Sequence, residues 1–387
     1  MIYFLFALLL LALAAIPTAM VFVNLPLFQR TSPISGGDLP AVSVLIPARN
    51  EEAGIAAAVQ TVLDSRHVRL EILVMDDHSN DRTAAIVEEL AQQIAQQQTT
   101  PGAKPPNHSL RLLHAAELPS GWNGKQHACW QLSQQAQFER LLFMDADVRL
   151  APEAVARLLA EQERIGCGLL SGFPHQRTES LAEQLLIPLM YFVLLGYLPL
   201  ARMRTSLQPE FGAGCGQLFL ARRQDYLAAG GHEAIRGSRH DGLQLPRSFR
   251  CSGIATDVVD ASDLASVRMY SDWHSVLQGL QKNATEGIAN AKLIFPFSVL
   301  LLGAAVLPIL TLAHGLFWGW PGAAMAVLGM ATLLSFAPRA MLAARFESSI
   351  WGTLLHPLAV AIFVAIQWQA FLNASFGGGP VAWKGRH

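Results

Sequence analysis

The chain has 387 residues, 52% of them hydrophobic, and a mean hydropathy of +0.31, which is too apolar for an ordinary soluble protein. Its 28 basic and 29 acidic residues leave a formal net charge of −1. The chain therefore has no overall positive charge that would attract a nucleic-acid backbone, and nucleic acid is not expected as a partner. The four cysteines form no C-x-x-C pair, which excludes a zinc site of that type and a disulfide framework.

Residues 1–29 contain no charged side chain and are long enough to cross a hydrocarbon core of about 30 Å as a helix. We predict an uncleaved transmembrane anchor, because the basic start of a cleaved signal peptide, the alternative, is missing. Arg30, Arg49 and Arg66 follow this segment, so the positive-inside rule puts the next domain in the cytoplasm. The sequence therefore predicts a multi-pass protein of the inner membrane whose next domain lies in the cytoplasm.

Residues 40–290 alternate short apolar runs with helical patterns. Strands are predicted at 41–48, 70–77, 110–115 and 139–147, and helices at 50–65, 79–97 and 124–137. This alternation is typical of an α/β domain with a mostly parallel sheet and helices on both faces. Ligands bind such sheets beyond the carboxyl ends of the strands. The acidic residues expected at that edge are Glu51, Asp76, Asp77, Asp145 and Asp147.

Asp145 and Asp147 end the apolar run LLFMDAD. As residues i and i+2 of a strand end they would share a face, and their mutual repulsion would be relieved by a divalent cation that prefers oxygen ligands. Mg²⁺ and Mn²⁺ accept carboxylates, waters and phosphate oxygens together, so a metal site is predicted here. The alternative is a solvated turn that caps a helix beginning at Pro152.

Two further motifs border the same edge. Asp76 and Asp77, in VMDDHSND, either accept hydrogen bonds from a nucleobase and ribose or belong to a helix-capping cluster with Asp81. Lys125, in GWNGK, starts a helix where its ammonium and free N–H groups suit a pyrophosphate. The alternative for GWNGK is a surface turn with Trp122 as a packing residue.

Three more apolar runs, at 293–318, 320–337 and 350–372, are predicted to cross the membrane and to be followed by a tail at 373–387. Arg339 and Arg345 would lie in a cytoplasmic loop. Lys384 and Arg386 in the tail favour the cytoplasmic side, whereas counting spans puts the tail outside, so one run is a candidate re-entrant segment. A shorter run at 185–200 predicts an interfacial helix.

IPARNEE, VMDDHSND, GWNGK and LLFMDADV occur in the order and approximate spacing of the family 2 glycosyltransferases, which have the GT-A fold and use nucleotide-diphospho-sugars. The chain resembles most the membrane-bound branch that includes hopanoid-associated and carotenoid glycosyltransferases. The resemblance covers about residues 40–290. It implies an inverting transfer of a sugar from a UDP-sugar donor to a lipid acceptor in the membrane, a hopanoid, carotenoid or similar isoprenoid.

The resemblance also implies roles for single residues. Asp76 and Asp77 would hold the base and ribose, and Lys125 would lie near the donor phosphates. Asp145 and Asp147 would hold the metal, Mg²⁺ or Mn²⁺. The residues implied to border the uridine are Pro47, Ala48, Arg49 and Glu51.

Asp241, in HDGLQLPRSFR, corresponds best to the family's catalytic base, with His240 and Glu233 as alternatives. Trp273 and Gln278 do not reproduce the Q-x-x-R-W motif of processive synthases, so a single transfer is expected. Two other functions stay open: a polyprenyl-phosphate sugar synthase, and a non-catalytic membrane transporter or scaffold with a degenerate nucleotide-binding domain. The near absence of charge in the predicted spans disfavours the transporter.

Overall fold

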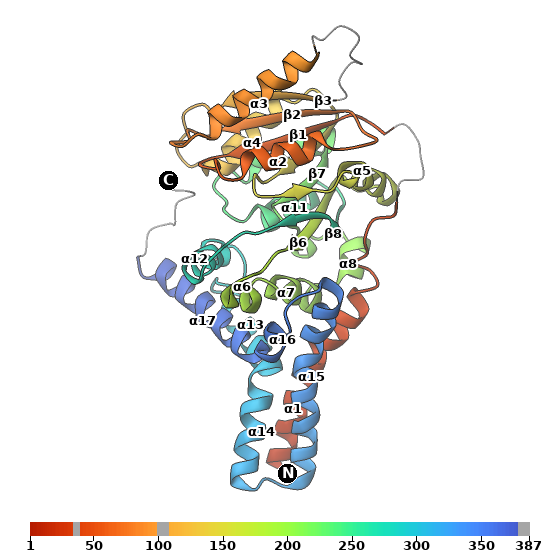
Figure 1. Cartoon of the computed structure of the whole chain (residues 1–387). Helices are drawn as coiled ribbons and strands as arrows, with labels where there is room; N and C mark the ends of the chain where they lie inside the picture. The colour runs from red at the N-terminus through yellow and green to blue at the C-terminus, as the bar shows by residue number, and fades with distance from the viewer. Residues whose placement is uncertain (34–38, 99–107, 378–387) are drawn as a thin grey trace. The chain divides into compact units, whose positions relative to one another are not determined.

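The computed structural model describes residues 1–33, 39–98 and 108–377, and the chain divides into two compact units (Figure 1). The sheet unit comprises residues 29–177 and 202–269, and the helical unit comprises residues 1–28, 178–201 and the described residues from 270 onward. The observed division differs from the predicted domain at 40–290, because residues 178–201 and 270–290 belong to the helical unit. Of the predicted tail, residues 378–387, which include Lys384 and Arg386, lie outside the described residues.

One mixed sheet forms the centre of the sheet unit, with the strand order β3-β2-β1-β4-β7-β6-β8-β5 (Figure 1). Its strands are β1 (Val42–Ala48), β2 (Leu70–Asp76), β3 (His108–His114), β4 (Arg140–Met144), β5 (Arg149–Leu150), β6 (Leu169–Gln176), β7 (Leu218–Arg222) and β8 (Thr256–Val267). Strands β3, β2, β1 and β4 pair in parallel, and so do β6 and β8. Strand β7 runs antiparallel to both of its neighbours, and β5 runs antiparallel to β8. The predicted mostly parallel sheet is confirmed.

Helices cover both faces of this sheet, as predicted. They are α2 (Ile55–Leu63), α3 (Thr83–Gln98), α4 (Gly124–Gln135), α5 (Ala154–Ile165), α9 (Arg223–Ala228), α10 (Gly231–Ala234) and α11 (Asp241–Cys251), with a 3₁₀ turn η1 (Pro209–Phe211). Val44 and Ile46 of β1 join an apolar cluster with α2, α3 and α5, whereas Leu45 joins a second cluster with α4, α9 and α11. Because both faces are covered, β1 is apolar at nearly every position.

Two element ends differ from the sequence prediction near the edge that carries the acidic residues. Strand β4 ends at Met144, so Asp145 and Asp147 lie in the turn that follows. Helix α2 begins at Ile55, five residues later than predicted, and Glu51 is therefore not in its first turn. The N–H groups of residues 50–52 donate to the side chains of Ser79, Thr83 and Asp81, and the N–H groups of residues 80 and 82 donate back to Asn50 and Glu52. These links hold residues 50–54 as a turn.

The helical unit contains α1 (Ile2–Asn24), α6 (Leu181–Leu186), α7 (Leu189–Tyr197), α12 (Trp273–Ala284), α13 (Ile294–Ala305), α14 (Leu307–Trp318), α15 (Gly322–Phe346), α16 (Ile350–Leu354) and α17 (His356–Ser375). The short helix α8 (Leu200–Thr205) lies where the chain passes from this unit to the next. Among the described residues, α1, α15 and α17 are long and apolar enough to cross a membrane. Helices α13 and α14 are bent by 52° at residue 306, so the predicted run at 293–318 forms a broken or re-entrant fourth candidate.

The segment predicted as one interfacial helix forms two helices, α6 and α7, which are interrupted around Pro188. Most of α7 is buried within the helical unit, and the ring of Tyr191 stacks on that of Phe346 with centroids 4.1 Å apart. Asn24, at the end of α1, donates to the carbonyl groups of Leu195 and Leu198. The apolar face of α7 therefore serves internal packing of this unit.

Helix α15 continues to Phe346, so Arg339 and Arg345 lie inside a helix and the predicted loop is wrong. Arg339 is buried, and its Nη2 donates to the carbonyl oxygens of Gln184 at 2.9 Å and Leu185 at 3.3 Å. Pro188 has no N–H, so the Gln184 carbonyl four residues earlier lacks its helical donor, and Arg339 supplies one. The predicted span at 320–337 stopped short of Arg339, so the sequence analysis did not foresee a buried guanidinium in this helix.

Candidate active site

Three of the predicted site residues meet at the edge of the sheet unit. The Nζ atom of Lys125 lies 2.7 Å from Oδ1 and 2.9 Å from Oδ2 of Asp145, and 2.9 Å from Oδ2 of Asp241. It also donates to the carbonyl oxygen of Gly216 at 3.2 Å. The side chains of Lys125, Asp145 and Asp241 are 15%, 26% and 12% exposed, so the cluster is largely buried but opens to solvent at Asp145. Residues from α4, the β4 turn and α11 thus converge as the sequence predicts.

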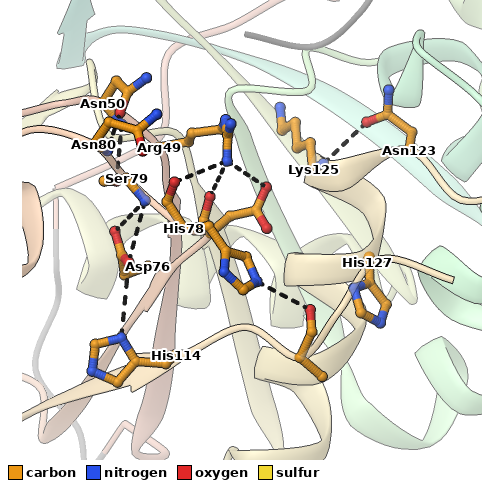
Figure 2. Close-up of polar contacts among 12 residues, drawn as sticks. Arg49, Asn50, Asp76, His78, Ser79, Asn80, His114, Asn123, Lys125 and His127 are labelled. Carbon is orange, nitrogen blue, oxygen red and sulfur yellow. Dashed lines mark hydrogen bonds and ion pairs between the residues drawn. The ribbon is translucent and has the colours of Figure 1, made fainter. Parts of the chain in front are cut away.

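Local backbone contacts place each of these side chains. Asn123 caps α4 by accepting from the N–H of Lys125 at 3.1 Å, so this N–H is not free for an anion as predicted (Figure 2). Asp145 is held against β7 by a hydrogen bond from its N–H to the carbonyl of Gln217. Asp241 opens α11 beside Gly216, where an added Cβ would lie only 1.9 Å from Oδ1 of Asp241. Glycine at 216 therefore leaves the space that the carboxylate occupies.

The charges of Lys125, Asp145 and Asp241 determine the protonation states of Lys125 and Asp241. Burial opposes ionisation of both Lys125 and Asp241, but the attraction between them outweighs it and Asp145 adds to the field at Lys125. The pKa of Lys125 is consequently held well above its usual value, and the pKa of Asp241 is held below its usual value. Asp241 is thus an ionised carboxylate that can accept a proton.

Asp147 is the second carboxylate of the turn. No donor among the described residues reaches its buried Oδ1 atom. Burial, together with the negative charges of Asp145 and Glu51, raises the pKa of Asp147 to about 7. The alternative that this turn caps the next helix is wrong, because α5 begins at Ala154 and its N-cap Glu153 makes no capping bond through its side chain.

The carboxylates of Asp145 and Asp147 are oxygen ligands of the kind that a divalent cation such as Mg²⁺ or Mn²⁺ takes. Within the described ranges no group of three or more His, Cys, Asp or Glu side chains could hold a metal ion. A cation here would therefore complete its coordination with water and phosphate oxygens, as Mg²⁺ and Mn²⁺ do.

Arg149 ties this turn to its neighbour, a contact that the sequence analysis did not foresee. Its Nη1 atom donates to the carbonyls of Ala146 at 3.0 Å and Val148 at 2.9 Å, and its Nη2 atom donates to Gly54 at 2.9 Å. The turn that carries Asp147 is thereby joined to the turn that carries Glu51. No residue spacing signals this link, because it depends on two turns brought together by the fold.

Replacing Arg149 with methionine is expected to loosen both turns while leaving the sheet folded. Loss of the charge-assisted bonds should lower the free energy of local opening by about 2 kcal/mol, which corresponds to roughly thirtyfold faster amide hydrogen exchange in residues 51–55 and 145–149. Hydrogen exchange with mass spectrometry measures this change. Arg157→Met, which removes an ion pair to Asp263 away from these turns, is the control. Equal exchange in the parent and Arg149→Met would show that the link is not structural.

The residues expected to border a nucleoside lie at or just after the ends of β1 and β2, and His114 ends the neighbouring β3 (Figure 2). The Nη1 atom of Arg49 donates to the carbonyl oxygens of Asp77 and His78 and lies 3.9 Å from Oδ2 of Asp77. Asp77 is fully buried, whereas Asp76 accepts from the N–H of Ser79 and lies 3.8 Å from Nδ1 of His114. At this edge the side chain of His114 is 69% exposed, whereas the side chains of Arg49 and Asp76 are only 11% and 8% exposed.

Three further predicted residues lie at the same edge and differ in burial. Pro47 and Ala48 are buried in β1, and the Ala48 carbonyl accepts from the N–H of Asp77 at 2.8 Å. Glu51 is half-buried, and its N–H donates to Oγ1 of Thr83. Asp81 accepts from both the N–H and the hydroxyl of Thr83, so the capping interpretation holds for Asp81.

The alternative bases are placed less favourably than Asp241. His240 is half-buried as the N-cap of α11, next to Asp241. Glu233 is exposed on α10. The buried His232, which the sequence analysis did not single out, lies within electrostatic range of Asp241, and its ring Nδ1 is 2.9 Å from the Tyr226 hydroxyl. Burial lowers the pKa of His232 to about 3, so it is neutral.

A cavity of about 450 Å³ lies elsewhere in the sheet unit. It is lined by residues of α5, α8 and the start of β8, including the ion pair of Arg204 with Asp257. None of the predicted site residues lines it. The chemistry predicted above therefore belongs to the edge cluster and not to this cavity.

The chain is similar in sequence and in structure to known glycosyltransferases. The model of the family described as glycosyl transferase family 2 matches residues 43–226. The match covers a little under half of the chain. The 4,4'-diaponeurosporenoate glycosyltransferase of Staphylococcus aureus is 27% identical to the chain over 357 residues, covering 89% of this chain and 88% of that protein. The protein is accordingly a glycosyltransferase, and the predicted resemblance to the carotenoid glycosyltransferase branch is confirmed.

A solved structure supports the fold. The mannosyltransferase of Pyrobaculum calidifontis, in complex with GDP-Man and Mn²⁺, is 18% identical and superimposes with a TM-score of 0.51, covering 94% of this chain and 99% of that one. The glycosyltransferase therefore has the predicted GT-A fold, combined with apolar helices near both ends of the described chain. The alternative of a non-catalytic transporter or scaffold is wrong.

Proposed function

We propose that the protein is an inverting glycosyltransferase that transfers a sugar from a UDP-sugar to an apolar isoprenoid acceptor held in the membrane. The observation that carries this proposal is the convergence of Asp145, Lys125 and Asp241 within hydrogen-bond distance. A donor diphosphate beside Asp145 and an acceptor hydroxyl or carboxylate beside Asp241 would place both reactants at one open edge of the sheet.

Each predicted residue has a part in this scheme. Arg49, Asp76 and Glu51 border the nucleoside, with Asp77 holding Arg49 in place and Pro47 and Ala48 providing the backbone wall. Lys125 supplies positive charge for the diphosphate next to Asp145. Asp145 and Asp147 would hold Mg²⁺ or Mn²⁺. The bound ion supplies charge stabilisation for the departing nucleoside diphosphate.

Asp241 acts as the base for a hydroxyl acceptor. Its ionised Oδ2 atom accepts the proton of the acceptor hydroxyl as that oxygen forms a bond to the anomeric carbon and the bond from that carbon to the phosphate oxygen breaks. One displacement from the opposite face inverts the anomeric centre. The neighbouring Lys125 keeps Asp241 ionised before the proton arrives.

The acceptor class is inferred from the relative in Staphylococcus aureus, whose name gives 4,4'-diaponeurosporenoate, a carotenoid-type molecule, as its substrate. The apolar helices α1, α15 and α17 suit an acceptor of this kind, because they are long enough to place the protein in the bilayer where such a molecule dissolves. We place the protein in the inner membrane with its sheet unit in the cytoplasm, where nucleotide sugars are made. A carotenoid, a hopanoid or a similar isoprenoid meets these conditions.

The test compares membranes that contain the parent protein with membranes that contain Asp147→Asn. Each is incubated with Mn²⁺, lipid extract and a radiolabelled UDP-sugar or GDP-sugar. We expect label in the lipid fraction from the UDP-sugar with the parent, and a reduction of at least a hundredfold with Asp147→Asn. Asp263→Asn, which changes an acidic residue paired with Arg157, is the control and should keep parental transfer.

The outcome also separates the alternatives. Equal label in lipid from the parent and Asp147→Asn would contradict the assigned site. Transfer from the GDP-sugar alone would replace the proposed donor. Labelled lipid that binds an anion exchanger through a phosphate would favour the polyprenyl-phosphate sugar synthase.

A further inference from the structure

The helical unit contains a buried polar cluster that the transfer reaction does not use. Within residues 1–33, 39–98 and 108–377, no partner reaches Nε or Nη1 of Arg339, either ring nitrogen of His356, or Oγ1 of Thr353. Arg339, His356 and Thr353 are 1%, 0% and 7% exposed. They come from α15, the first residue of α17 and α16. Buried polar atoms are normally hydrogen-bonded, so this group requires an explanation.

Arg339 lies close to the backbone of α16 and to His356. A Cβ added to Gly352, the residue before Thr353, would lie 2.6 Å from Nη2 of Arg339, so the backbone of α16 approaches the guanidinium closely. Arg339 is also near enough to His356 for its charge to act on the imidazole. The ring of Phe192 packs edge-on against His356 with centroids 4.7 Å apart, which gives the cluster an apolar wall.

The hydrogen bonds from Arg339 to α6 use only the Nη2 atom of its guanidinium. Nη2 donates to the carbonyl groups that have no helical donor because of the break at Pro188. The Nε and Nη1 atoms make no such bond to a described residue. In the described part of the chain no carboxylate pairs with Arg339. A buried, uncompensated charge is costly, and an ionisable residue inside an apolar helix commonly marks a functional site.

We propose that Arg339, His356 and Thr353 bind the oxyanion of an apolar molecule, a carboxylate or a phosphate attached to a hydrocarbon chain. The planar fork of a guanidinium pairs with two oxygens of such a group, and the hydroxyl and an imidazole N–H can donate to the remaining lone pairs. The surrounding apolar helices match the hydrocarbon part. This site lies in a different unit from the nucleotide edge and does not depend on the proposed transfer.

Native mass spectrometry of the full chain released from detergent micelles tests the site with matched ligands. Oleate is compared with oleyl alcohol, and lysophosphatidic acid with monoacylglycerol, so that each pair differs in the acidic group. We expect the acid of at least one pair to bind at least tenfold more tightly than its neutral partner. Binding of oleate alone identifies a carboxylate as the ligand group, and binding of lysophosphatidic acid alone identifies a phosphate.

Variants assign any acid-specific binding to this cluster. Arg339→Met should remove the preference for the acid, whereas Arg345→Met, on the same helix, should keep it. Thr353→Val retains the tie between Arg339 and α6 and should weaken acid binding severalfold, which provides a second test where Arg339→Met fails to fold. Equal binding of acid and neutral partner by the parent, or an acid preference that survives in both Arg339→Met and Thr353→Val, would overturn the proposal.

Discussion

Asp241→Asn is expected to lower the rate constant for sugar transfer by about a thousandfold, because a general base contributes roughly 10²–10⁴ to such a rate. Asparagine keeps the shape of the side chain beside Gly216 but cannot accept the acceptor's proton. The proposed nucleotide-binding edge, at the ends of β1 and β2, is not touched. Steady-state transfer assays should therefore show a fall in kcat, while calorimetric titration should show UDP binding within about threefold of the parent.

Two other variants distinguish Asp241 from its alternatives. Glu233→Gln changes an exposed acidic residue and should leave kcat near the parental value. His240→Gln changes the N-cap of α11 and should have a smaller effect than Asp241→Asn. A large loss of kcat in His240→Gln combined with more than a tenth of parental kcat in Asp241→Asn would transfer the role of base to His240.

Lys125→Met is expected to damage both stability and transfer, because it leaves Asp145 and Asp241 facing one another without a cation. Removing one partner of a largely buried ion pair costs about 3–5 kcal/mol, and solvent access at Asp145 puts the expected loss of unfolding free energy near the lower value, about 3 kcal/mol. Transfer should fall at least a hundredfold. Urea unfolding and the radiolabel assay measure the two effects.

The controls for this variant separate charge from geometry. Lys125→Arg retains the charge but brings a planar fork in place of a compact ammonium, so it should recover most of the stability and only part of the transfer. Lys292→Met removes an exposed lysine and should leave both unchanged. Parental unfolding free energy in Lys125→Met would show that the two carboxylates do not depend on Lys125.

The sequence predicted the elements whose pattern is local. Strand β1 is apolar at nearly every position and ends at Pro47 and Ala48, and the first three strands alternate with helices. The order of elements and the shared carboxyl edge therefore followed directly. The gathering of Lys125, Asp145 and Asp241 followed from the motif order and from the family resemblance. These inferences needed only periodicity, chain order and the rule that parallel strands end at one edge.

Features that depend on distant contacts could not be predicted. The turn at 50–54 replaces a helical start because its N–H groups bond to side chains near Thr83. Arg339 is tolerated in α15 because Pro188, 151 positions earlier, frees a carbonyl for it. Gly216 and Arg149 carry no motif of their own, although the repeated glycines at 212, 214 and 216 were a signal that the backbone comes close to something there.

The antiparallel direction of β7 determines which loop lies at the reaction site, and so where acceptor specificity can change. Because β7 runs against β4, the residues that precede β7, rather than those that follow it, reach the edge where Lys125 meets the Gly216 carbonyl. Insertions or deletions in this approach loop, between η1 and β7, can reshape the mouth of the reaction site without shifting the register of any parallel strand. Changes of this kind are confined to the start of the loop, because Gly216 leaves room for Asp241 and the carbonyls of Gly216 and Gln217 hold Lys125 and Asp145.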